Sequence, residues 1–191
     1  MKGRVFCLFL IGSLCGFAEL RYTTDSYETA SYGSSSGSDY NCTFSHGFCG
    51  WRQGTGDDFD WSLGSRNTPS TGTGPDGDHT SYYGQYVYIE ASSPRQVNDS
   101  ADLEGPYFNI YQWETKCFSF WYNMNGVSVG RLNVYTVSSE YRNTAWRNLV
   151  WTMDHNRGPD WHHGLVNITG SGQIKIAIRA ERCRLSRGYC H

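Results

Sequence analysis

The sequence has no apolar run long enough to cross a lipid bilayer as a helix, which takes about 20 residues. Its longest apolar run, residues 5–14, is well short of that length. Basic residues are not in excess, since 16 Lys and Arg stand against 18 Asp and Glu, so the chain lacks the basic face that binds nucleic acid. The catalytic motifs H-E-x-x-H and G-x-S-x-G are absent as well. These absences predict a soluble protein that is neither a nucleic-acid-binding protein nor an enzyme.

Residues 1–18 have the composition of a secretory signal peptide. Lys2 and Arg4 precede the apolar run, and the small residues Gly16 and Ala18 follow it. This order predicts cleavage after Ala18 and export to the extracellular space. Because cleavage removes Lys2 and Arg4, the net charge changes from −2 in the full chain to −4 in the secreted chain.

The number of cysteines becomes odd after this cleavage. The full chain has seven, and Cys7 and Cys15 leave with residues 1–18. Those that stay are Cys42, Cys49, Cys117, Cys183 and Cys190. In an oxidising compartment an odd number indicates a free thiol, a covalent bond to another chain, or a truncated sequence.

Three N-x-S/T sequons agree with export and predict a glycoprotein. They begin at Asn41, Asn98 and Asn167. Asn98 is the best candidate because it lies in the polar stretch 92–102, whereas the cysteine beside Asn41 is expected to hinder transfer of the glycan.

The chain divides into a leader and one domain. Residues 19–40 are rich in Ser, Gly, Thr and Tyr with few aliphatic side chains, so we expect them to be disordered. Residues 41–191 are long enough for a single domain with its own core. Within them apolar and polar residues alternate with a period of two, and no helical period of useful length occurs. The predicted strands are 85–90, 117–122, 131–137, 146–152, 164–169 and 173–180. This pattern predicts an all-β fold, an antiparallel β-sandwich.

Two segments in a fixed order are the most specific feature of the sequence. Residues 42–61 read CTFSHGFCGWRQGTGDDFDW, and residues 72–80 read GTGPDGDHT. Together they resemble the opening of a MAM domain, the extracellular module of meprins, neuropilins and mu-type receptor tyrosine phosphatases. The resemblance implies a β-sandwich of jelly-roll type and a non-enzymatic role in extracellular protein-protein interaction or adhesion, with other proteins or with copies of itself.

Two other functions remain open at this stage. One is carbohydrate binding by the jelly-roll, because exposed aromatic rings beside Asn and Asp are suited to sugars. The second is that the chain is an ancillary domain fragment of a larger extracellular protease.

The resemblance also implies roles for residues in the first segments. Cys42 and Cys49 are expected to form a local disulfide. Alternation would bury Phe59 and Trp61, leaving Asp58 to accept backbone N–H bonds. As an alternative, Asp58 and Asp78 could bind Ca²⁺ or Na⁺, although two carboxylates fall short of the 6–8 oxygens that calcium takes. No other cofactor is expected.

MAM domains close with a strand followed by a final cysteine, and the resemblance fades before that point. From residue 183 this chain reads only CRLSRGYCH. We therefore expect the MAM-like domain, residues 41–191, to be incomplete at its C-terminus. A Cys183–Cys190 disulfide is favoured, which leaves Cys117 alone. The alternatives pair Cys117 with Cys183 or with Cys190.

Histidines and tryptophans complete the set of candidate site residues. His162 and His163 are adjacent on a predicted strand, so they should point to opposite faces and not share a metal ion. Most tryptophans are expected in the core, and some could stack against sugars. They are Trp51, Trp61, Trp113, Trp121, Trp146, Trp151 and Trp161.

Overall fold

The structure is a computed structural model. It describes residues 5–9, 14–16, 41–126, 129–139, 147–183, 185–186 and 189–190, and side chains within 41–126, 129–139 and 147–183. The predicted leader, residues 19–40, and Trp146 lie outside the described residues, and the predicted signal peptide lies mostly outside them.

The described residues form strands, turns and loops, and no helix occurs among them. The strands are β1 (Val5–Phe9), β2 (Leu14–Gly16), β3 (Arg52–Gln53), β4 (Ser62–Ser65), β5 (Gln85–Glu90), β6 (Ser100–Glu104), β7 (Phe108–Ile110), β8 (Thr115–Asn123), β9 (Arg131–Ser138), β10 (Arg147–Asp154), β11 (His162–Thr169), β12 (Gly172–Glu181), β13 (Leu185–Ser186) and β14 (Tyr189–Cys190).

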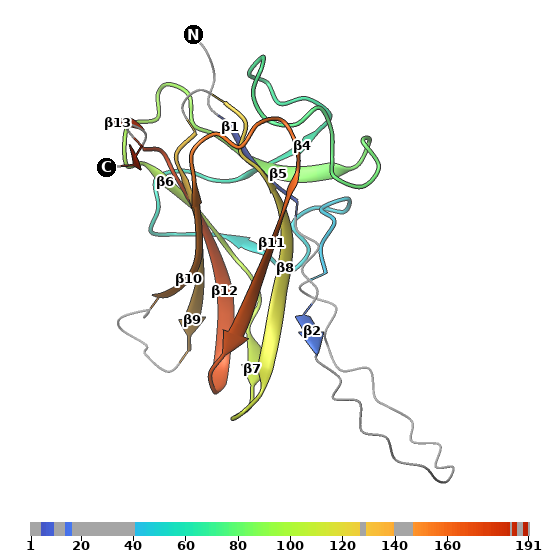
Figure 1. The fold of residues 1–191 in the computed structure, drawn as a ribbon, viewed down its shortest axis with the longest axis vertical. Helices are drawn as coiled ribbons and strands as arrows, with labels where there is room; N and C mark the ends of the chain where they lie inside the picture. The colour runs from blue at the N-terminus through green and yellow to red at the C-terminus, as the bar shows by residue number, and fades with distance from the viewer. Residues whose placement is uncertain are drawn as a thin grey trace.

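Two six-stranded sheets form the two layers seen in Figure 1. Sheet I has the order β11-β8-β1-β5-β4, with β2 also pairing with β8. Sheet II has the order β10-β9-β12-β6-β3, with β7 also pairing with β12. Every pairing is antiparallel. The prediction of an all-β antiparallel sandwich is confirmed.

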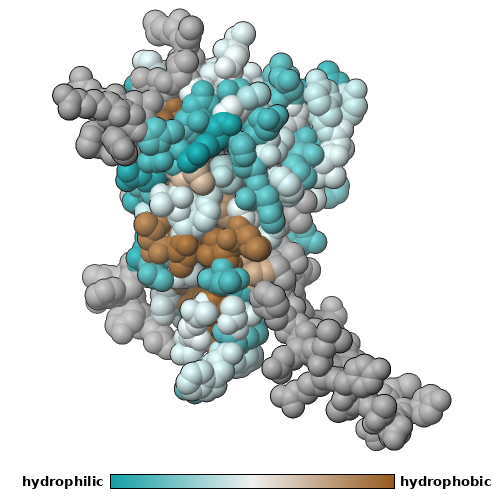
Figure 2. Space-filling model, viewed as in Figure 1, coloured by the Kyte–Doolittle hydropathy of each residue, from teal (hydrophilic) through white to brown (hydrophobic). Residues whose placement is uncertain are grey.

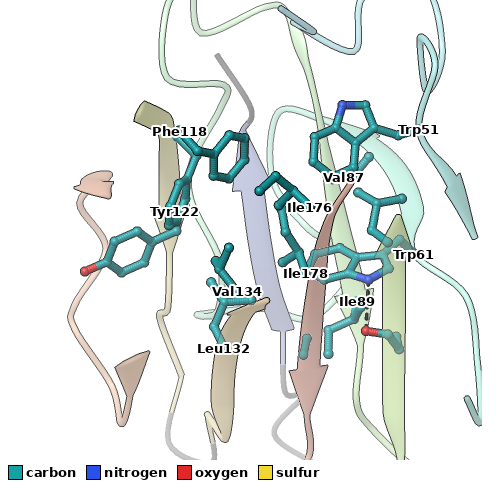
Figure 3. Close-up of a cluster of buried hydrophobic side chains, with 14 of the residues drawn as sticks. Trp51, Trp61, Val87, Ile89, Phe118, Tyr122, Leu132, Val134, Ile176 and Ile178 are labelled. Atoms are coloured by element: carbon teal, nitrogen blue, oxygen red, sulfur yellow. Dashed lines mark hydrogen bonds between the residues drawn. The ribbon is translucent and has the colours of Figure 1, made fainter. Parts of the chain in front are cut away.

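The core lies between the sheets and is built by the alternation visible in the sequence (Figure 3). On β5, Val87 and Ile89 are fully buried, while Tyr88 between them is only half-buried. Sheet II contributes the buried side chains of Leu132 and Val134 from β9. The other buried side chains labelled in Figure 3 are Trp51, Trp61, Phe118, Tyr122, Ile176 and Ile178. A fully buried side chain of this size contributes about 1.5–3 kcal/mol to folding, so the two inner faces hold the sandwich together.

Strand β6 was not predicted, because its sequence Ser-Ala-Asp-Leu-Glu is polar. Ser100–Glu104 nevertheless forms a strand inside sheet II, between β12 and the end strand β3. Ala101 and Leu103 enter the core, and Asp102 is buried on the opposite face. The polar stretch 92–102 is therefore partly a buried strand, and the reason is a set of ionic partners from β10 and β12 that the local sequence does not show.

The N-terminal segment contributes two strands to sheet I. β1 pairs with β5 on one side and with β8 on the other, antiparallel to both. β2 pairs with β8 further along, where Cys15 is the register partner of Cys117. The described part of the apolar run that was predicted to belong to a signal peptide, β1, therefore occupies a central position in sheet I of the 191-residue chain.

Candidate functional site

The disulfide between Cys42 and Cys49 is confirmed, and it closes a tight loop at the start of the domain. Gly47 reverses the chain inside this loop at φ +91°, a conformation that favours glycine. The loop places Phe44 and Trp51 in the core. Its role is structural, since it fixes the first buried aromatic rings against the sandwich.

The acidic segment that follows is tied to β6. Asp57 Oδ2 accepts a hydrogen bond from the Asp102 backbone N–H at 2.6 Å, and Asp58 Oδ2 accepts one from Ser100 N–H at 2.8 Å. Phe59 and Trp61, which follow these aspartates in the chain, are buried. The predictions that the aromatic rings are buried and that Asp58 accepts backbone N–H bonds are confirmed.

Asp78 organises the loop at residues 74–84. Its carboxylate accepts bonds from the backbone N–H groups of Thr80, Ser81 and Gly84 at 2.9, 3.1 and 2.7 Å, and from the Ser81 hydroxyl at 3.0 Å. Burial by itself raises the pKa of Asp78, but these donors outweigh it and lower the pKa below its ordinary value. Among the described residues, the hydrogen bonds of the Asp78 carboxylate all lie within its own loop, which it stabilises.

The two aspartates considered as cation ligands have different surroundings. Asp58 binds the start of β6 in sheet II, and Asp78 binds its own loop. Within the described part of the chain, no three His, Cys, Asp or Glu side chains come together as a metal site would require. The N–H donors already offset the charge of Asp78, so a cation would have to displace them. A Ca²⁺ or Na⁺ site at Asp58 and Asp78 stays a prediction.

The loop 74–84 covers a group of rings on the outer face of sheet I, which we call the outer cluster: His79, Tyr86, Trp121, Trp161 and His163. His79 stacks on Trp121 with ring centroids 3.7 Å apart. The ring centroid of His163 lies 4.9 Å from that of Trp121. Trp161 packs edge-on against Tyr86 at 5.9 Å and donates its indole N–H to the Gly77 carbonyl at 3.0 Å. The outer cluster holds the GPDGDHT loop against the sheet.

The titration of His79 reflects this position. Burial lowers its pKa, the negative charge of Asp78 raises it, and the neighbouring His163 lowers it, so the pKa lies below its ordinary value. A neutral imidazole is suited to stacking on Trp121 in a half-buried site. Of these rings, only those of the tryptophans were expected mainly in the core. The pairing of His79 with Trp121 could not be predicted because 41 residues separate them in the sequence.

His163 also contacts a hydroxyl, at 2.7 Å between Nε2 and Ser119 Oγ. A nucleophilic serine needs a base that is itself oriented by a third group. Among the described side chains, no carboxylate accepts a hydrogen bond from His163. His162 contacts Tyr122 and the Arg157 carbonyl instead, so the prediction that His162 and His163 point to opposite faces is confirmed.

The outer face of sheet II carries a charge network of Asp102, Glu104, Arg147, Lys175 and Arg179. Arg179 donates two hydrogen bonds to the Asp102 carboxylate, at 2.7 and 2.8 Å, and Arg147 forms an ion pair with it at 2.8 Å. Glu104 binds Arg147 at 3.3 Å and also Lys175. Burial raises the pKa of Asp102, but the two arginines outweigh it and lower the pKa. Each of these five charged side chains forms an ion pair with another member of the network.

Two exposed leucines lie on end strands of the two sheets. Leu149 on β10 is 50% exposed and Leu165 on β11 is 57% exposed. Figure 2 shows a band of hydrophobic residues at mid-height, over β10 and β11. We call Leu149 and Leu165 the apolar edge. β10 ends sheet II and β11 ends sheet I, so each has a backbone edge without a partner strand among the described residues.

The predicted glycosylation sites and tryptophans are distributed over the surface and core as follows. Asn41, Asn98 and Asn167 are all exposed, and Asn167 shares the exposed row of β11 with Leu165.

The prediction that most tryptophans are core residues is wrong for the described ones, because only Trp51 and Trp61 are fully buried. Trp121, Trp151 and Trp161 are half-buried, and Trp113 is 92% exposed.

Cys117 is disulfide-bonded in the chain that includes residues 1–18, so the expectation of a lone Cys117 is wrong for this form. That expectation assumed a chain without Cys7 and Cys15. Cys183 is also disulfide-bonded, and the pairing of Cys183 with Cys190 stays a prediction because the side chain of residue 190 lies outside the described set.

Comparison with known proteins agrees with the fold and the motifs. The family model for the MAM domain, meprin/A5/mu, matches residues 42–191. The chain is 37% identical over 143 residues to human MAM domain-containing glycosylphosphatidylinositol anchor protein 2, which covers 68% of this chain and 15% of that protein. It is 33% identical over 153 residues to human MAM domain-containing glycosylphosphatidylinositol anchor protein 1, covering 76% and 16%. Zebrafish (Danio rerio) Neuropilin-1a is 33% identical over 142 residues, covering 71% and 14%.

The chain thus spans only a small part of the length of these relatives. No helix in the described segments is long and apolar enough to span a membrane. The disulfide at Cys42 and Cys49, the buried FDW element and the Asp78 loop are the features through which the matched sequence builds its sandwich. On the match over residues 42–191, the chain belongs to the MAM domain family.

Proposed function

We propose that this chain is a secreted, glycosylated, non-enzymatic module that binds extracellular proteins, including copies of itself, through the apolar edge. Membership of a family whose relatives include neuropilin and glycosylphosphatidylinositol anchor proteins supports an extracellular role. Residues 1–18 act as its signal peptide in this proposal, and Asn41, Asn98 and Asn167 are its acceptors for glycans.

The exposure of Leu149 and Leu165 is the observation that carries the choice of surface. The outer face of sheet II carries the charge network, whose members already bind one another. That network therefore has little unpaired charge with which to bind a partner. The apolar edge instead combines exposed aliphatic area with strand edges that another chain can pair with. Binding there needs only surface complementarity and no bond chemistry.

Bead aggregation tests the self-binding part of this proposal. The purified chain is coupled to fluorescent beads, and the size of the bead clusters is measured for the wild type, Leu149→Asp and Leu165→Asp. We expect both variants to reduce clustering. The matched control is Leu63→Asp, because Leu63 is 37% exposed on β4, the opposite end strand of sheet I. Equal clustering by Leu165→Asp and the wild type, at equal thermal stability, would refute a role for the apolar edge.

Carbohydrate binding is the second candidate, and the turn between β7 and β8 favours it. Trp113 is 92% exposed and Tyr111 is 69% exposed, beside the carboxylate of Glu114. Exposed rings next to a polar acceptor are suited to stacking on sugar faces. A glycan array with the wild type and Trp113→Ala tests this function, which requires a glycan signal that the variant loses.

A further inference from the structure

The position of β1 in sheet I shows that the domain has a gap that takes one strand. β1 lies between β5 and β8, with Phe6 and Leu8 opposite Ile89 and Val87, and with Leu8 also opposite Tyr122. In Figure 3 the blue ribbon of β1 runs between the strand that carries Phe118 and Tyr122 and the strand that carries Val87 and Ile89. Because β1 is antiparallel to both neighbours, β5 and β8 run parallel to each other.

The two strands that line this gap, β5 and β8, cannot form hydrogen bonds with each other. Neighbouring strands lie about 4.8 Å apart, so two strands separated by a third are about 9–10 Å apart and out of hydrogen-bonding range. Without a central strand, backbone groups of β5 and β8 would face the gap unpaired inside the sandwich, which native structures avoid. Both faces of the gap are covered. The core covers one face, and the outer cluster covers the other, where Trp121 is half-buried and stacks with His79.

We propose that the gap between β5 and β8 is a strand-acceptor site, which binds an extended segment of another polypeptide once residues 1–18 have been removed. This inference rests on the processing included in the proposed function. The segment would run antiparallel to both walls and extend each ladder by backbone hydrogen bonds, as in strand-addition complexes.

The buried residues of the walls define the chemistry of the partner. Val87 and Ile89 are fully buried, so the two partner residues opposite them must be apolar and must be separated by one residue. Leu8 and Phe6 hold these positions in the full chain. A polar or charged residue there would be buried beside the core, so the site discriminates between segments by their alternation pattern.

The test compares two secreted forms of the full chain from animal cells. One is expressed with its own N-terminus, and mass spectrometry reads where the secreted product begins. The other follows a foreign signal peptide whose cleavage leaves Met1, so β1 is retained. Each is mixed with a synthetic peptide of residues 4–10 carrying Cys7→Ser. The control peptide carries Phe6→Asp and Leu8→Asp as well.

Hydrogen exchange of β5 and β8 amides is the readout. We expect the peptide to slow exchange in the processed form by about tenfold or more and to raise its melting temperature, with no effect on the form that retains β1. Equal protection by the control peptide, or full protection of both walls with no peptide, would overturn the inference. Retention of residues 1–18 in the secreted product would also overturn it, while leaving the bead assay to judge protein binding separately.

If the processed form is not secreted in a folded state, it is co-secreted with residues 4–10 fused to an unrelated carrier protein. Rescue of folding by this carrier, and not by the doubly substituted control, supports the acceptor site. Failure of rescue while the form with β1 folds normally contradicts it.

Discussion

Replacement of Asp102 by Asn removes the centre of the charge network while keeping the size of the side chain. The Asp102 carboxylate is 1% exposed. It accepts two hydrogen bonds from Arg179 and forms the ion pair with Arg147. An Asn amide offers one acceptor oxygen and no charge, so Arg179 loses its hydrogen-bonded carboxylate and Arg147 keeps only its ion pair with Glu104.

The magnitude follows from burial on the two sides of the pair. Breaking a buried ion pair by removing one partner typically destabilises a protein by about 3–5 kcal/mol. Arg147 and Arg179 keep 25% and 28% side-chain exposure, so water can partly solvate their charges in the variant. We therefore expect Asp102→Asn to lower the free energy of unfolding by about 2–3 kcal/mol, and the melting temperature by about 5–10 °C for a domain of this size.

The pH dependence of the stability difference provides a second, independent test of this prediction. The folded-state pKa of Asp102 is lowered, so its contribution is present above the unfolded-state pKa of about 3.9 and is lost as the pH falls through the folded value. The stability difference between the wild type and Asp102→Asn should therefore be constant from pH 7 to about pH 5 and shrink below pH 4.

Urea unfolding followed by tryptophan fluorescence measures these differences. The matched control is Asp60→Asn, which removes a carboxylate that is exposed. A loss of stability in Asp102→Asn no larger than in Asp60→Asn, or a difference that does not shrink in acid, would refute the assignment of Asp102 as the ionic centre of sheet II.

Other predictions concern the loop, the outer cluster and the surface. Replacing both Cys42 and Cys49 by Ala should lower the free energy of unfolding by about 2–3 kcal/mol, measured by urea unfolding, because the short loop loses its closure. The stabilisation that comes from neutral His79 is complete above its unfolded-state pKa of about 6.5 and is lost as the pH falls below it, so melting curves from pH 8 to 5 should show a smaller loss for His79→Phe than for the wild type. Chelation by EDTA should leave the melting temperature unchanged, because Asp78 is already satisfied by N–H donors; a fall on chelation would favour the cation site. Asn167→Gln should remove one glycan mass and increase bead clustering, since Asn167 is exposed on β11 in the same row as the apolar edge; unchanged mass would show that this sequon is not used.

Much of the sandwich could be predicted from period-two alternation. The bounds of β5 are those predicted, and the strands now labelled β8, β9, β11 and β12 were each located within two residues at either end. These strands could be predicted because each has a continuous apolar face; only residues 117–122 are largely apolar on both faces. The MAM resemblance added the Cys42–Cys49 disulfide, which alternation alone would not give, and it identified the FDW element, whose alternation predicted that Phe59 and Trp61 are buried.

The features that could not be predicted depend on residues far apart in sequence. Asp102 belongs to a strand only because Arg147 and Arg179 neutralise it from 45 and 77 residues away. The outer cluster likewise joins His79 to Trp121, although each residue alone is equally consistent with a core or a surface position. Propensity reasoning sees neither contact.

The most direct test of the account is the equilibrium binding of the fluorescently labelled secreted chain to the surface of animal cells, measured by flow cytometry for Leu165→Asp against Leu63→Asp. Covering an exposed leucine at an interface is worth about 1–2 kcal/mol, so the account predicts that Leu165→Asp weakens binding by about tenfold while Leu63→Asp binds like the wild type. Equal binding of both variants, with unchanged melting temperatures, would contradict the claim that this MAM domain engages its partners through the edge formed by β10 and β11.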